Sequence, residues 1–172
     1  IVQPSTYGTD NRCTLAALAA LGRSSRAVAV GDDTVADAEL KRLDGLGVRG
    51  IRFNLSPAGA TTPAMIEPLA KRIAPFGWHL QLNAPAAILF DLMPIFERVP
   101  VPLVFDHLAH VPPADGVNHP LYQKVRGLLD RGRTWIKLSG VYIDSESGPP
   151  TYSDSSAIAR ALPCGSGVPQ PD

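Results

Sequence analysis

The feature that most constrains the fold is a regular alternation of short apolar runs with amphipathic stretches along the chain. Apolar runs that predict strands begin near residues 1, 27, 48, 78, 101 and 134. Each run is followed by a helical pattern, and no hairpin signal separates consecutive runs. Such alternation is typical of a parallel sheet wrapped by helices. The sequence therefore predicts an α/β fold of about six parallel βα units.

Helix signals accompany each of these predicted strands. The predicted helices lie near residues 10–21, 32–45, 62–75, 85–98, 120–129 and 153–162. Asp32 and Asp33 are predicted to cap the second helix, and Thr62-Pro63 forms a favoured helix start. Pro94 falls inside the fourth helix and should bend or interrupt it, because proline cannot donate a backbone hydrogen bond.

Chain length leaves two architectures open at this point. A full (β/α)₈ barrel takes about 250 residues, and this chain has 172. The count fits either a barrel with pieces missing or a complete doubly wound sheet. The motifs GxGxxG and GxxxxGK[ST] are absent from the sequence, so the nucleotide-binding versions of the open sheet lose their usual support.

Charge and hydropathy argue against nucleic-acid and membrane partners. Sixteen basic residues balance sixteen acidic ones, which argues against a nucleic-acid-binding surface. No apolar run approaches the roughly 20 residues of a membrane span, and the chain opens at Ile1 without a signal-peptide pattern. We expect a cytoplasmic protein that contacts neither nucleic acid nor membrane.

Polar residues gather at the ends of the predicted strands on a single parity. Side chains alternate faces along a strand, so residues two apart share a side. The shared side carries Gln3 and Ser5, Arg52 and Asn54, His79, Gln81 and Asn83, His107, and Lys137 and Ser139. Because parallel α/β folds bind small molecules at the carboxyl ends of their strands, we predict a solvated pocket there. The alternatives are strands that face solvent, or charges that satisfy one another in buried pairs.

The order of these segments resembles a known family. The matching segments are QPSTYGTDN (3–11), VRGIRFN (48–54), WHLQL (78–82), FDHL (105–108) and WIKLSG (135–140). Together they resemble the branch of the amidohydrolase superfamily that contains 2-pyrone-4,6-dicarboxylate lactonase and related lactone hydrolases. The resemblance implies a (β/α)₈ barrel that hydrolyses lactones or related carboxylic esters. The fold prediction becomes an incomplete (β/α)₈ TIM-barrel-like domain over residues 1–162.

This sequence departs from the family pattern at several places. The HxH motif of the first barrel strand and the catalytic Asp of the eighth are not found, so by analogy Ile1 enters at barrel strand two. Asn83 stands where many relatives have His, and Ile143-Asp144 replaces an expected Arg. A second Arg is missing from 55–60, so dicarboxylate specificity does not carry over. We expect a truncated form, with an irregular Pro/Gly-rich tail at 163–172 that a frameshift or shortened reading frame would produce.

The resemblance implies roles for the strand-end residues. A family histidine at the position of His107 polarises the lactone carbonyl or contacts a metal, which makes His107 the catalytic candidate. Its alternative is a hydrogen-bonded core histidine. Arg52 suits a clamp on a substrate carboxylate or a structural ion pair. The other candidate substrate-binding residues are Ser5, Tyr7, Asn54, Gln81, Asn83, Lys137 and Ser139. Asp106 has the opposite parity and is predicted to point towards the helices in a structural role.

The functional prediction is a hydrolase of lactones or carboxylic esters, metal-dependent or metal-independent. A catalytically inactive fragment or a small-carboxylate-binding protein is the alternative. No metal ligands and no cofactor are assigned, although the resemblance implies a divalent metal such as Zn²⁺ or Mn²⁺ in full-length relatives. Six strands cannot close a barrel, and unpaired edges favour association. A homodimer through the open sheet edges is therefore expected.

Overall fold

A computed structural model of the chain describes residues 1–55 and 59–163. In these ranges five parallel strands form one sheet in the order β1-β2-β3-β4-β5. The strands are β1 (Ala27–Ala29), β2 (Val48–Asn54), β3 (His79–Asn83), β4 (Leu103–Phe105) and β5 (Thr134–Ile136). Each strand pairs with the next along the chain, whereas the strand order of a doubly wound sheet reverses. The predicted α/β fold is confirmed, and its sequential order is that of an open arc of a TIM-like barrel.

The first predicted strand is reduced to a single bridge. Val2 pairs in parallel with Val28. The Val28 N–H donates to the Ile1 carbonyl at 2.8 Å, and the Gln3 N–H donates to the Val28 carbonyl at 2.9 Å. The Gln3 side chain is buried and donates to the carbonyl of Asp10, 2.8 Å away, so it holds the following turn in place. The sheet therefore has five strands and one flanking bridge where the sequence predicted six strands.

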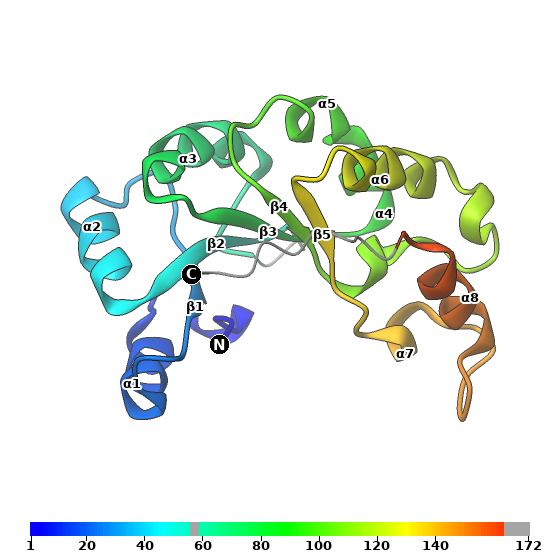
Figure 1. Cartoon of the computed structure of the whole chain (residues 1–172), viewed down its shortest axis with the longest axis horizontal. Coiled ribbons are helices and arrows are strands. Elements are labelled where there is room, and N and C mark those ends of the chain that lie inside the picture. The colour runs from blue at the N-terminus through cyan, green and yellow to red at the C-terminus, as the bar shows by residue number, and fades with distance from the viewer. Residues whose placement is uncertain (56–58, 164–172) are drawn as a thin grey trace.

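Helices flank the curved sheet on its outer side and beyond its two ends (Figure 1). They are α1 (Arg12–Leu21), α2 (Asp37–Leu46), α3 (Ile66–Ile73), α4 (Ala86–Asp91), α5 (Met93–Phe96), α6 (Pro120–Asp130), α7 (Val141–Asp144) and α8 (Ser153–Ala161). Helices α2, α3, α5 and α6 follow the convex side of the arc, and α7 and α8 lie beyond β5 (Figure 1). Because these helices cover the convex side of the sheet, the polar strand ends face the concave side.

The structure moves one predicted helix start and confirms one predicted interruption of a helix. The Asp32 carboxylate accepts the backbone N–H and the hydroxyl of Thr34, so it caps a turn, and α2 begins later, at Asp37. The predicted effect of Pro94 is confirmed. The helical segment is divided at Leu92 into α4 and α5, and Pro94 lies in the first turn of α5, where its missing N–H is tolerated.

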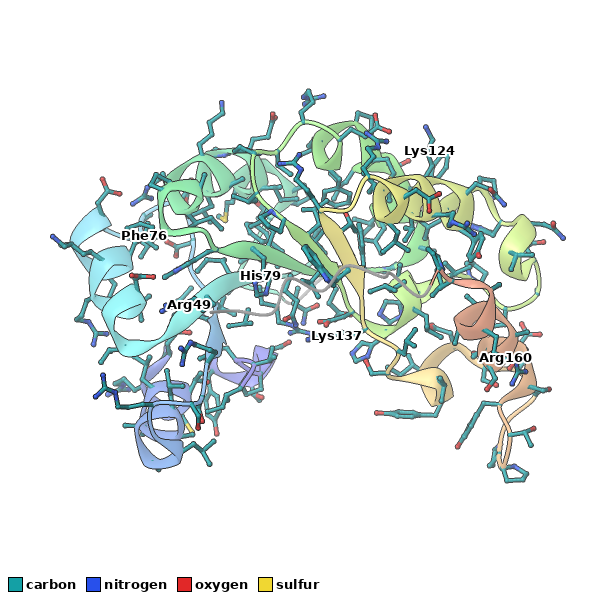
Figure 2. The ribbon with its side chains drawn as sticks, viewed as in Figure 1. Arg49, Phe76, His79, Lys124, Lys137 and Arg160 are labelled. Carbon is teal, nitrogen blue, oxygen red and sulfur yellow. The ribbon has the colours of Figure 1, made fainter. Side chains whose placement is uncertain are left out.

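The core lies between the sheet and the outer helices. The large apolar residues of β2, β3 and β4 alternate along each strand and are fully or almost fully buried: Ile51, Phe53, Leu80, Leu82, Leu103 and Phe105. The Phe105 ring meets the Phe96 ring of α5 edge-on, with centroids 5.6 Å apart. The intervening residues face the concave side, where His79 and Lys137 are seen in Figure 2, while Lys124 lies in the outer helical layer. Replacing a buried phenylalanine here by alanine would cost about 3–5 kcal/mol.

Two further sequence predictions concern the chain as a whole. In the described ranges, no helix has the length and apolar character needed to traverse a bilayer. The predicted tail at 163–172 lies outside the described residues from position 164 onwards.

Candidate functional site

The strand register brings the polar ends of β2 and β3 to the same height. Arg52 is the register partner of Gln81, and Asn54 is the partner of Asn83. One step earlier, Gly50 is opposite His79, and a Cβ at Gly50 would lie 2.6 Å from Cε1 of the His79 ring. Glycine is therefore required beneath that imidazole. The predicted common side of these two strands is present in the structure.

On β4, the structure corrects the predicted parity. Val104 is the partner of Gln81, and Phe105 is the partner of Leu82, so Phe105 faces the helices and Asp106 faces the concave side. The prediction that Asp106 points towards the helices is wrong. That prediction assumes that the strand continues as far as His107, so that Phe105 and His107 share a side. The strand instead ends at Phe105, and the backbone turns sharply at His107, where φ is 50°.

Asp106 is the centre of a buried polar cluster. Its carboxylate accepts from Arg52 Nε at 3.1 Å, from Gln81 Nε2 at 3.0 Å and from Lys137 Nζ at 2.9 Å. Burial alone would raise the pKa of this carboxyl, but hydrogen bonds from Lys137 and Gln81 and the charges of Lys137 and Arg52 outweigh it. The pKa of Asp106 therefore lies below its ordinary value. The side chains of Arg52, Gln81, Asp106 and Lys137 thus form one hydrogen-bonded group around an ionised carboxylate at the ends of β2 to β5. We call this group the Asp106 cluster.

A left-handed turn follows this cluster. The φ angles of His107, Leu108, Ala109 and His110 are 50°, 54°, 55° and 50°. Left-handed backbone costs roughly 1–2 kcal/mol per residue with a Cβ, so four in a row must be held by surrounding contacts. Ala109 is fully buried, and the rings of His107 and His110 meet edge-on with centroids 5.6 Å apart. The turn places two imidazoles side by side at the strand ends.

His107 lies against the segment after β5. Its Nδ1 is 3.1 Å from the hydroxyl of Ser139, which is exposed. Burial lowers the pKa of His107, because desolvation of the imidazolium outweighs the attraction of Asp106, and the charges of His110, Arg52 and Lys137 act in the same direction. Gly140 has φ 68°, and a Cβ there would lie 2.5 Å from His107 Nδ1. The close approach of the two segments therefore depends on glycine.

A second network runs along the mouth through amide side chains. Ser5, in the short helix η1 (Ser5–Tyr7), accepts from Asn54 Nδ2 and, at 3.3 Å, from Arg52 Nη1. Asn83 Nδ2 donates to Asn54 Oδ1 at 3.1 Å. His110 Nε2 lies 2.8 Å from Asn83 Oδ1. At the far end, His110 Nδ1 lies 2.9 Å from Asp144 Oδ2. This chain of contacts, called the amide network below, comprises Ser5, Asn54, Asn83, His110 and Asp144. It joins η1, β2, β3, the left-handed turn and α7.

The candidate residues therefore fall into three groups. The first group is Arg52, Gln81 and Lys137, which meet at Asp106. The second is Ser5, Asn54 and Asn83, which belong to the amide network. The third is His107, which pairs with Ser139. Tyr7 is exposed and, among the described residues, is not joined to either network by a hydrogen bond. His110 and Asp144 were not predicted as site residues. The signal for His110 was its place three residues after His107.

A pocket of about 460 Å³ opens beside the amide network. Asn83, His110 and Asp144 supply its polar lining, and Pro85, Pro112 and Pro113 are among its walls. A second pocket, of about 350 Å³, lies at the amino ends of β1 and β2, where Arg23, Arg26 and Arg49 contribute to its lining. Arg26 and Arg49 donate to backbone carbonyls there, so these arginines stabilise helix ends and turns.

The described residues do not fit a resident metal ion. No group of three or more His, Cys, Asp or Glu side chains with metal-binding geometry occurs in residues 1–55 and 59–163. Asp106 is already held by Arg52, Gln81 and Lys137, and His110 by Asp144 and Asn83. A divalent ion on these donors would have to break hydrogen bonds that stabilise the fold.

Comparison with known proteins places this arrangement in context. A family model described as Amidohydrolase matches residues 1–164. D-galactarolactone isomerase of Agrobacterium fabrum is 28% identical over 162 residues, covering 94% of this chain and 55% of the relative. A 2-pyrone-4,6-dicarboxylate hydrolase of Comamonas testosteroni is 31% identical over 152 residues, covering 87% of this chain and 50% of the relative.

A solved structure extends the likeness to the fold. It is a protein of Acinetobacter baumannii described as a probable 2-pyrone-4,6-dicarboxylic acid hydrolase with citric acid bound. The TM-score is 0.75 at 28% identity, and the match covers 92% of this chain and 60% of that chain. The chain thus spans about half the length of the curated relatives it matches.

Proposed function

Because the chain belongs to the amidohydrolase family, we propose that its strand ends bind a carboxylate-bearing lactone or ester and promote hydrolysis of the acyl–oxygen bond. Membership confirms the resemblance predicted from the five sequence segments. The observation that carries the proposal is the charge of the Asp106 cluster. Two cations, Arg52 and Lys137, share one carboxylate, so one positive charge is left to attract an anion.

His107 is the proposed electrophile in this reaction. Its lowered pKa favours the neutral ring near pH 7, and a neutral imidazole can donate one N–H to an oxygen that gains negative charge. A preorganised donor of this kind is worth several kcal/mol in a water-poor site. Ser139 would hold the ring in place through its hydroxyl. Arg52 and Lys137 would attract the carboxylate of the substrate.

The named relatives support the substrate class. One relative is named for hydrolysis of a pyrone dicarboxylate, another for isomerisation of a lactone, and a solved structure holds citric acid. Lactones, simple esters and small carboxylates are therefore the compounds to test. Because the match covers only part of each relative, the activity of the whole proteins is a proposal for this chain.

A pH-stat assay tests the hydrolase proposal. The protein would be given simple lactones and aryl esters, with and without a chelator, and compared with His107→Ala. We expect turnover that a chelator does not abolish and that His107→Ala lowers about 100-fold or more. Turnover that is unchanged by His107→Ala would contradict the assigned site.

A carboxylate-binding protein without turnover is the second candidate. The bound citric acid in a similar structure favours it. Calorimetry with citrate separates the two candidates when it is run beside the pH-stat assay. Saturable citrate binding that is lost in Arg52→Ala, with no turnover of any lactone or ester, would establish binding alone.

We also propose a homodimer through the two open edges of the sheet, at β5 and at residues 1–3, which flank β1, because strand edges favour association. Light scattering at several concentrations tests it, and a monomer at every concentration would contradict it. The cytoplasmic location remains a prediction from the sequence.

A further inference from the structure

His110 lies between two oxygen acceptors at the edge of a pocket. Its Nδ1 is 2.9 Å from Asp144 Oδ2, and its Nε2 is 2.8 Å from Asn83 Oδ1. Only 15% of the His110 side chain is exposed, against 31% for Asp144. A carboxylate on one ring nitrogen fixes the tautomer and leaves the other nitrogen to exchange a proton. The pair has the geometry of an acid–base dyad.

The backbone beneath this histidine is strained. His110 has φ 50° and ends a run of four residues with left-handed backbone, none of which is glycine. Backbone strain of this kind persists only where the surrounding structure holds it, and it clusters at functional sites. Leu108 and Ala109, which anchor the turn, are buried. The fold therefore maintains an unfavourable backbone at the residue whose ring enters the pocket lining.

The pocket has room for a small substrate. Its volume is about 460 Å³, and Asn83, His110 and Asp144 are its polar lining residues. Ligand pockets commonly measure roughly 300–1,000 Å³ and carry a few convergent polar groups. The ring of His107, the proposed electrophile, lies edge-on to His110 at 5.6 Å between centroids. Because the two rings are in contact, a carbonyl bound alongside the pair, at the His110 edge of the pocket, would lie near both.

We propose that His110, oriented by Asp144, transfers the protons of the hydrolysis; this rests on the function proposed above. Nε2 takes a proton from water as the water oxygen bonds to the carbonyl carbon. The same proton then passes from the imidazolium to the ring or ester oxygen as the acyl–oxygen bond breaks. The products are a carboxylic acid and an alcohol, joined in one molecule for a lactone. No other reactant is needed.

Asn83 has a defined place in this cycle. As the side chains stand, both ring nitrogens of His110 face oxygens, and an amide or carboxylate oxygen can only accept from a ring nitrogen. The neutral ring that accepts a proton needs Nε2 to be released from Asn83 Oδ1. Displacement of the Asn83 amide by substrate would release it, whereas a half-turn of the amide would not, because Nδ2 would then donate to Nε2. Asn83 and Asp144 are therefore positioning residues, and His110 is the catalytic one.

Chemical rescue tests this assignment. His110→Gly leaves a cavity where the ring stood and tolerates the positive φ, so it should fold without the strain. We expect His110→Gly to lower kcat about 100- to 10,000-fold, with citrate affinity within about threefold of the parent. Added imidazole should restore at least about tenfold. His110→Asn, which also accepts left-handed backbone, should be equally impaired and should not respond to imidazole.

Two more variants separate position from chemistry. Asp144→Asn should lower kcat and change the tautomer of His110, read from its ¹⁵N chemical shifts. His119→Asn is the matched control, because His119 accepts the N–H of Leu121 at the start of α6 and asparagine can cap that helix as well. It should leave kcat unchanged.

The outcomes distinguish the two proposals. Turnover in the parent protein that His110→Gly leaves within threefold would overturn the role of His110 and leave the proposed hydrolase intact. A loss in His110→Gly that imidazole does not restore would also overturn it, because a structural role predicts that result. No turnover in the parent protein would contradict the proposed function itself, and the role of His110 with it.

Discussion

Two polar networks share the carboxyl ends of the same strands and differ in how far water reaches them. In the Asp106 cluster, the side chains of Asp106 and Arg52 are 3% and 10% exposed. In the amide network, His110 and Asp144 are 15% and 31% exposed, and they line a pocket. The buried network ties strands together and sets the local charge. The open network lines the pocket, and Lys137, whose side chain is 36% exposed, is the part of the buried network that a ligand can reach.

Because the two networks differ in exposure, residues of the same type have different roles in them. Asp106 and Asp144 each contact a basic side chain, but only Asp106 is surrounded by fixed donors in the protein interior. A buried charge that loses its partners is strongly destabilising, whereas a partly exposed one is solvated by water. We therefore expect the loss of Asp106 to act mainly on stability, and changes in the amide network to act mainly on chemistry.

Removing the central carboxylate should have the largest effect on stability. Asp106→Ala leaves Arg52 and Lys137 facing each other without an acceptor, so we expect a loss of about 3–5 kcal/mol in the free energy of unfolding. Urea unfolding at neutral pH measures it. Asp144→Ala is the matched control and should cost about 1 kcal/mol or less. Equal losses in the two variants would remove the distinction between the networks.

The contact between Gly140 and His107 should give the next largest effect. Gly140→Ala adds a Cβ 2.5 Å from His107 Nδ1 at a residue with φ 68°, so we expect about 1–3 kcal/mol of destabilisation and a displaced His107. Gly148→Ala has nearly the same φ, 65°, but nothing lies within 4 Å of its added Cβ. Its cost should be the backbone strain alone. Thermal unfolding and lactone turnover should separate the two variants, and identical behaviour would show that the close contact is unimportant.

Acid should destabilise the fold by a smaller amount, through two histidines on the concave side of the sheet. Burial and the charge of Lys137 lower the pKa of His79, and burial lowers that of His107. Their contribution to stability is complete above about pH 6.5, the pKa of histidine in an unfolded chain, and is lost as pH falls below it. Each group can change the free energy of unfolding by at most about 1.4 kcal/mol per pH unit. His79→Gln should flatten the curve of Tm against pH between 7 and 5, and an unchanged curve would contradict this cause.

Much of the fold was predictable because it depends on local patterns. The alternation of Ile51 and Phe53 with Arg52 fixes which side of β2 meets the helices, and Pro94 fixes the break between α4 and α5. Those signals need no knowledge of distant contacts. The family resemblance then selected the barrel-like arc over the doubly wound sheet.

The site was less predictable because it depends on a backbone that propensities disfavour. No sequence pattern in His107–His110 predicts four left-handed φ angles, since none of these residues is glycine. The register of β4 directs Asp106 to the concave side, and the turn after it places His110 in the pocket lining. Asp144 was noted only as the residue that replaces an expected arginine. Its contact with His110 depends on α7, a one-turn helix that sequence patterns did not predict.

The most direct test of the central claim is a titration of ¹⁵N-labelled protein with citrate, followed by amide chemical shifts. The account predicts saturable shifts around Lys137, Ser139 and the turn from His107 to His110. Shifts confined to the arginine-lined pocket at the amino ends of the strands, or no saturable shifts at all, would contradict it.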